Sequence, residues 1–115
     1  MNIAFTVPGR PVPAARMTQR GTFLARSQKY LAYKEEVGWL AKEAMNGRNP
    51  TDGCILVEIW AYVSGKKPGD IDNIAKSILD GMNKIVYLDD RQVIDLIIHR
   101  RNALPERAEI MVRRV

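Results

Sequence analysis

The middle of the chain reads Cys-Ile-Leu-Val-Glu-Ile-Trp-Ala-Tyr-Val over residues 54–63. β-Branched and aromatic residues fill this stretch, and both kinds favour strands. Five apolar residues share one face because they alternate with their neighbours: Ile55, Val57, Ile59, Ala61 and Val63. The alternation predicts a β-strand with one face buried in a core.

A helix is predicted on each side of this strand. The first covers residues 27–46, begins at Ser27 as N-cap and ends before Gly47 and Pro50. The second runs from about Asp72 to Lys84. Apolar residues recur at helical spacing in both, at Tyr30, Tyr33, Val37, Leu40, Ala41 and Ala44 in the first, and at Ile74, Ala75, Ile78, Leu79, Met82 and Ile85 in the second.

Three further segments have strand character, at residues 2–7, 93–101 and 108–114. The order is therefore β-α-β-α-β-β. We expect an α+β domain (a two-layer α/β arrangement) in which two helices cover one face of a mixed sheet. The last two strands are expected to form a hairpin. We interpret residues 1–115 as one domain.

Composition excludes several classes of site. The chain has 115 residues, one cysteine, one histidine and a formal net charge of +5. A disulfide framework and a Cys- or His-rich zinc site are excluded. There is neither an apolar run of membrane-spanning length nor a signal-peptide pattern at the start, so a cytoplasmic location is expected.

Acidic residues gather in one part of this basic chain. Asp70 and Asp72 flank the expected start of the second helix, Lys76 follows one turn later, and Asp89-Asp90 lies in the next turn. The extended approach that Pro68-Gly69 favours allows Asp70 and Asp72 to point the same way. Oxygen ligands select hard cations, so this cluster indicates Mg²⁺, with Mn²⁺ as a substitute.

Each acidic pair also has a purely structural interpretation. An aspartate before a helix commonly caps it, and Asp-Asp between two elements commonly forms a solvated turn. A cap, however, requires neither a second acid two residues earlier nor a lysine one turn on. The combination favours a metal site that faces a phosphate backbone.

The spacing Asp70-x-Asp72-Asn73-x-x-Lys76, followed by Leu88-Asp89-Asp90-x-Gln92-Val93, resembles the signature of the RusA family of Holliday junction resolvases. Members of that family are small Mg²⁺-dependent homodimeric endonucleases, often of phage or prophage origin. The resemblance is strongest over residues 66–100. It implies an enzyme of DNA recombination and repair that resolves four-way junctions by paired symmetric nicks.

The resemblance also assigns residues. It implies that Asp70, Asp72 and Asp90 are catalytic and bind the metal, and that Lys76 is the catalytic lysine. Asp89 is expected only to orient its neighbour or the turn. Asp80 is expected to pair on the helix surface with Lys76 or Lys84 at i,i+4 spacing.

Basic residues concentrate in two loops that are expected to lie near these acids. They are expected to contact DNA phosphates: Arg10, Arg16, Arg20, Arg26, Lys66 and Lys67. Two other functions remain open at this point. One is a nucleic-acid-binding module without catalysis, and the other is an Mg²⁺-dependent nuclease for flaps, other branched substrates or RNA.

Overall fold

The computed structural model describes residues 1–17 and 24–115. These residues form four strands, two α-helices and one short 3₁₀ helix. The strands are β1 (Asn2–Pro8), β2 (Ile55–Tyr62), β3 (Val93–Arg101) and β4 (Arg107–Arg114). The helices are α1 (Ala25–Met45), α2 (Ile71–Met82) and the 3₁₀ helix η2 (Asp90–Gln92). The predicted order β-α-β-α-β-β is confirmed.

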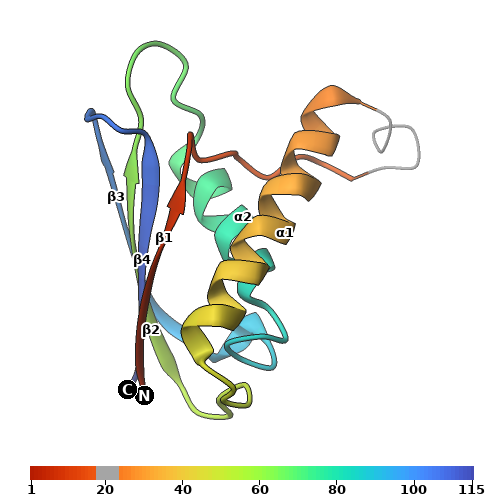
Figure 1. Cartoon of the computed structure of the whole chain (residues 1–115), viewed down its shortest axis with the longest axis vertical. Coiled ribbons are helices and arrows are strands. Elements are labelled where there is room, and N and C mark those ends of the chain that lie inside the picture. Colours follow the sequence, from red (N-terminus) through yellow and green to blue (C-terminus); the bar gives the residue numbers. More distant parts are fainter. Residues whose placement is uncertain (18–23) are drawn as a thin grey trace.

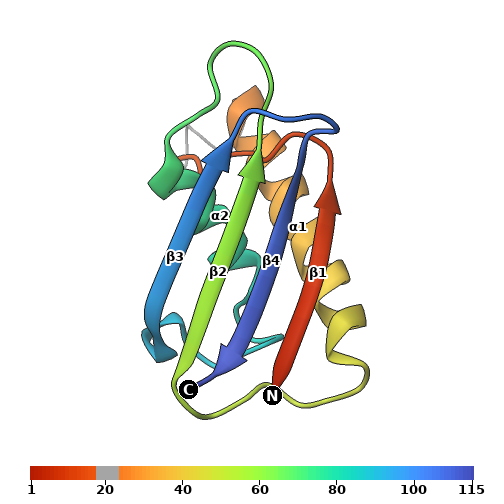
Figure 2. The same cartoon turned by 90° about the vertical axis from the view of Figure 1, so that its left-hand side faces the viewer.

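The strands make one mixed sheet in the order β1-β4-β2-β3 (Figure 2). β4 runs antiparallel to both β1 and β2, whereas β3 runs parallel to β2. Both helices lie against the same face of the sheet, as predicted (Figure 1). The opposite face carries no helix among the described residues (Figure 2).

The predicted hairpin between the last two strands is wrong. β2, α2 and β3 form a parallel crossover unit, which places β3 beside β2 at the edge of the sheet. β4 then passes to the other side of β2 and pairs there, with Ile110 opposite Ile59. The crossover leaves one edge of β3 unpaired, next to the end of the sheet that α2 covers (Figure 2).

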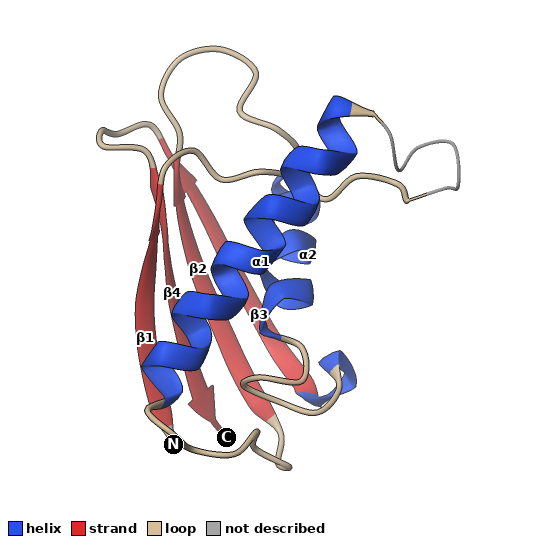
Figure 3. Cartoon of the chain, turned by 45° about the vertical axis from the view of Figure 1, so that its right-hand side comes forward, coloured by secondary structure: helices blue, strands red, loops and turns tan. Residues whose placement is uncertain are grey.

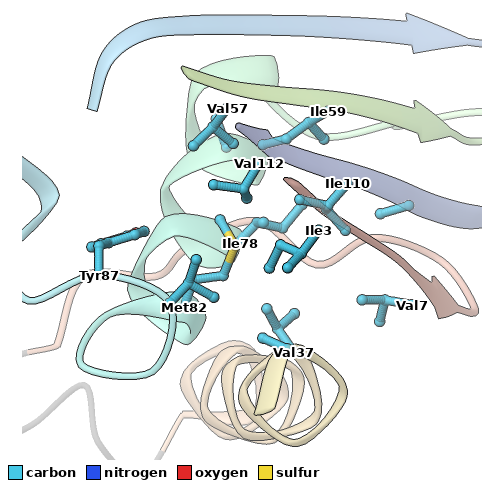
Figure 4. Close-up of a cluster of buried hydrophobic side chains, with 14 of the residues drawn as sticks. Ile3, Val7, Val37, Val57, Ile59, Ile78, Met82, Tyr87, Ile110 and Val112 are labelled. Carbon is cyan, nitrogen blue, oxygen red and sulfur yellow. The ribbon is translucent and has the colours of Figure 1, made fainter. Parts of the chain in front are cut away.

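The core lies between the sheet and the two helices (Figures 3 and 4). The alternate residues of β2 that the sequence assigned to one face are all buried. They meet Val37 from α1 and Ile78 and Met82 from α2, and β4 adds Ile110 and Val112 (Figure 4). A domain of this size buries enough apolar surface for one core of this kind.

The first helix differs from its prediction at its start. α1 begins at Ala25 with Leu24 as N-cap, so Ser27 lies inside the first turn and is fully buried. Its end agrees with prediction. Asn46 and Gly47 both adopt positive φ, 51° and 81°, which closes the helix in the way that a glycine permits.

Candidate active site

A cleft of about 370 Å³ opens between α2, η2 and β3. Its polar lining consists of Asp72, Lys76 and Asp80 from α2 and Asp90 from the start of η2. Ile71, Ala75, Leu79, Leu96 and Ile98 provide the apolar lining. The three polar residues of α2 are spaced four positions apart, so they form one stripe along the helix. Two predicted metal ligands and the predicted catalytic lysine thus line the same cleft.

Lys76 is held by its neighbours. Its Nζ lies 3.0 Å from Oδ2 of Asp80, which confirms the predicted i,i+4 pair. The hydroxyl of Tyr30, on α1, donates a hydrogen bond to the same oxygen. Burial, and then the Asp80 carboxylate, raise the pKa of Tyr30, so its hydroxyl keeps its proton and remains a donor. The hydrogen bond between Tyr30 on α1 and Asp80 on α2 therefore holds the Asp80 carboxylate in place. That carboxylate in turn holds the Lys76 ammonium.

The start of α2 leaves its two aspartates free. Asp70 is the N-cap residue, with extended backbone angles, but its side chain makes no capping hydrogen bond. Asp72 lies in the first turn. Neither carboxylate has a hydrogen bond or ion pair with another described residue, so the capping interpretation is wrong. An unpartnered carboxylate at a helix start is available to a cation.

Two contacts hold the segment that leads into α2. Gly69 has a φ of +82°, which favours glycine, and its carbonyl accepts a 2.6 Å hydrogen bond from the Arg100 guanidinium. The backbone N–H of Ala14 donates to the Asn73 carbonyl at 2.9 Å. The first aspartate is thus tied to β3 and to the loop after β1.

The turn that carries Asp90 is built around Gln92. The Gln92 side chain accepts from the backbone N–H groups of Leu88 and Asp89, each at 2.9 Å, and donates to two carbonyls of the loop before β2. The Asp89 carboxylate accepts from the Arg91 N–H, which completes a capping box. That N–H, and then the Arg91 side chain, hold the pKa of Asp89 below its usual value. Asp89 orients the turn, as expected.

A comparison with known protein families identifies the family of the chain. The family model for the endodeoxyribonuclease RusA matches residues 8–113. The chain belongs to the RusA family. YqaN of Bacillus subtilis (strain 168), whose name describes it as uncharacterised, is 39% identical over 46 residues. That match covers 40% of this chain and 32% of YqaN, so the aligned part is about a third of the relative.

The predicted cage of three aspartates is not formed in this RusA family member. Asp70 is exposed and is absent from the lining of the cleft, and the described residues contain no cluster of three or more acidic, His or Cys side chains suited to a metal. Asp72 and Asp90 remain as two carboxylates that line one cleft. Because Mg²⁺ commonly takes only one or two protein carboxylates and completes its shell with water and phosphate, the acidic lining of this cleft is of the kind that the ion uses.

The predicted DNA-binding residues fall into different environments. Arg16, Arg26, Lys66 and Lys67 are exposed, and Arg20 lies outside the described residues. Arg10 is half-buried and its guanidinium is engaged within the chain. It contacts Glu106 at 2.8 Å and the carbonyls of Ser64, Lys66 and Lys67. Arg10 therefore holds the loop that carries Lys66 and Lys67. Its contact with DNA stays a prediction.

Three contributors to the site were not predicted from the sequence. Asp80 was assigned only to the helix surface, yet it also lines the cleft. Tyr30 was assigned to the core, and its contact with Asp80 depends on how the two helices cross. Gln92 was quoted only as part of a motif, although Asp89-x-x-Gln92 has the spacing of a capping box and could have been identified from sequence.

Proposed function

We propose that the protein is a Mg²⁺-dependent endonuclease that cuts branched DNA, with four-way junctions as its principal substrate. The observation that carries this proposal is the cleft that Asp72, Asp90 and Lys76 line, within a chain of the RusA endodeoxyribonuclease family. A basic protein that keeps unpaired carboxylates beside a lysine is suited to bind a phosphodiester through a divalent cation.

Each side chain has a part in this proposal. In this proposal Asp72 and Asp90 are ligands of the cation, and Asp70, two residues before Asp72, joins them when DNA and metal are bound. The bound ion supplies a water of lowered pKa and polarises the phosphate. Lys76 balances the negative charge that develops on the phosphate oxygens. Asp80 and Tyr30 keep the Lys76 ammonium at the wall of the cleft until DNA arrives.

We further propose that two copies act together. Two symmetric nicks need two identical sites, and a C₂ homodimer provides them. Apolar side chains on the unpaired edge strand support this proposal, because Ile94 and Ile97 of β3 are exposed and lie outside the cleft. Sedimentation should show a dimer that Ile94→Lys dissociates. A monomeric wild-type protein would remove this part of the proposal.

The proposed substrate also indicates where in the cell the protein acts. Among the described helices none has the length and apolar character needed to cross a membrane. We propose a cytoplasmic location because the DNA substrate resides there. Recombination and repair would be the processes served.

The test is a cleavage assay with four synthetic substrates: a four-way junction, a flap, a plain duplex and an RNA. Wild-type protein should nick the junction symmetrically in Mg²⁺ and not in EDTA. Asp72→Asn and Asp90→Asn should abolish cleavage while junction binding persists. Glu43→Gln, at an exposed carboxylate of α1 outside the cleft and away from β3, should behave as wild type. Preferred cleavage of flaps or RNA would reassign the substrate, and binding without any cleavage would indicate a binding module.

A further inference from the structure

A second and larger hollow lies on the other side of α2. It occupies about 940 Å³ between α1 and α2 and continues to the loop after α1. The floor is formed by small and apolar residues, including Gly38, Gly81 and Ile85. We refer to this hollow as the helix groove. Its volume lies near the upper end of the range for ligand pockets, so it has room for more than one small group.

The charges around the helix groove are mostly positive. Four cationic side chains line it, Lys34, Lys42, Arg48 and Lys84, against two acidic ones, Glu35 and Asp80. Asp80 is already paired with Lys76. The surplus of cations favours an anionic occupant. A protein partner is disfavoured, because lysine is depleted at the cores of protein interfaces.

Trp39 stands in this groove with 66% of its surface exposed. Such exposure is unusual for a large aromatic side chain. Trp60 contrasts with it, since that ring is half-buried and stacks on His99 with ring centres 5.2 Å apart. Lys42 holds its Nζ 6.0 Å from the centre of the Trp39 ring, which places a cation beside an available aromatic surface.

The helix groove adjoins the candidate active site. Asp80 lines both hollows, so α2 is the wall that separates them. Figures 1 and 3 show α2 packed beside α1 over the same face of the sheet.

We propose that the helix groove binds an unpaired stretch of a DNA strand, with Trp39 stacked on a base and the lysines in contact with its phosphates. This combination of an aromatic platform and a cationic track is how proteins hold single strands without reading their sequence. The proposal deepens the proposed function and rests on it for the identity of the nucleic acid. A four-way junction is base-paired throughout, so the groove would hold bases that the protein opens at the point where the arms meet.

The test measures binding of a fluorescent oligothymidylate to full-length protein by anisotropy, in EDTA and over a range of salt concentrations. Trp39→Ala should weaken binding by about 5- to 150-fold, the range found when a stacking aromatic is removed. Trp39→Phe should retain part of the affinity. Lys42→Gln should reduce the slope of log affinity against log salt by about 0.7, because this variant neutralises one phosphate fewer.

Lys29→Gln is the matched control, because Lys29 is an exposed lysine of α1 outside the groove. It should bind as wild type does, and circular dichroism should show every variant folded. Unchanged affinity of folded Trp39→Ala would overturn the proposal. So would sedimentation showing that this substitution dissociates a dimer, since the groove would then be an interface between copies.

The two proposals fail separately. If wild-type protein cuts no DNA but Trp39→Ala weakens oligothymidylate binding, the nuclease proposal fails and the groove remains a nucleic-acid site. If junctions are cut and the oligothymidylate binds equally to wild type and Trp39→Ala, the groove proposal fails and the nuclease stands.

Discussion

The Lys76 ammonium and the Asp80 carboxylate lie 3.0 Å apart, one turn from each other on α2, and both line the cleft. The pair is partly exposed, so its contribution to stability is small, in the range of about 0–1 kcal/mol. The pair matters because it sets the position of the Lys76 side chain. Asp80 keeps a flexible lysine near the place where phosphate would bind, and Tyr30 keeps Asp80 in place from the neighbouring helix.

Asp80→Asn should therefore reduce the rate of junction cleavage while changing stability little, because a neutral amide holds Lys76 less firmly. A double-mutant cycle distinguishes positioning from a structural role. In a Lys76→Gln background, Asp80→Asn should have no further effect on the cleavage rate. Glu43→Gln, at an exposed carboxylate of α1 outside the cleft, serves as the control. Additive losses in the double variant would contradict a role that acts through Lys76.

Gly81→Ala should destabilise the protein. A Cβ at this position would lie 2.7 Å from Val37 Cγ1 and 2.9 Å from the Lys34 carbonyl oxygen. The backbone of α1 cannot move aside locally, so the helices would be forced apart at a cost of about 1–3 kcal/mol. The gain in helix propensity, about 1 kcal/mol, offsets only part of this.

Urea unfolding measures the difference for Gly81→Ala. Gly38→Ala is the informative comparison, because its nearest contacts are longer, at 3.2 Å, and one of them is the end of the Ile85 side chain. It should cost less than Gly81→Ala. Equal stability of Gly81→Ala and wild type would show that the two helices tolerate a wider separation.

Tyr33→Phe should stabilise the protein by about 1 kcal/mol at neutral pH. The Tyr33 hydroxyl is buried and has no hydrogen-bond partner among the described residues, and removing such a group recovers its desolvation penalty.

The same substitution should change the response to alkaline pH. Burial, and then the charge of Glu36, raise the pKa of Tyr33 above its ordinary value of about 10. The stability that this shift contributes is complete below pH 10 and is lost as the pH rises further, because the unfolded chain ionises first. Unfolding free energy of Tyr33→Phe should fall less steeply above pH 10. Parallel curves for the two proteins would contradict this.

The sequence predicted what depends on local pattern. Alternation at residues 54–63 located β2 and its buried face, and the helical spacing from Ile74 to Met82 located the core face of α2. The two parts of the acidic motif also pointed to one site. Asp72 and Asp90 line one cleft although eighteen positions apart, because β3 runs along α2 from the end of the helix, near Asp90, to its start, near Asp72.

What depends on tertiary arrangement was not predicted. Strand pairing of β3 and β4 was assigned to the nearest neighbour in sequence, whereas the crossover places β2 between them. The role of Gly81 was hidden for the same reason. From sequence alone, a glycine inside a helix indicates only a lower helix propensity. The close approach of Gly81 to α1 exists only once the two helices pack. The orientation of the Asp70 side chain likewise depends on the fold and on its ligand.

Gln92→Ala should impair cleavage, although Gln92 is not among the residues proposed to contact the metal or the DNA. The wild-type amide accepts two hydrogen bonds from the turn before Asp90 and donates two, at 2.8 and 2.9 Å, to the carbonyls of Thr51 and Gly53. Removing them should cost about 1–3 kcal/mol and loosen the turn that carries Asp90. The Mg²⁺ concentration needed for half-maximal cleavage should rise.

Gln92→Glu keeps the two accepted bonds but cannot donate, so it should hold the turn and lose its attachment to the loop before β2. Cleavage by Gln92→Ala with wild-type Mg²⁺ dependence would show that Asp90 is positioned by something other than this amide.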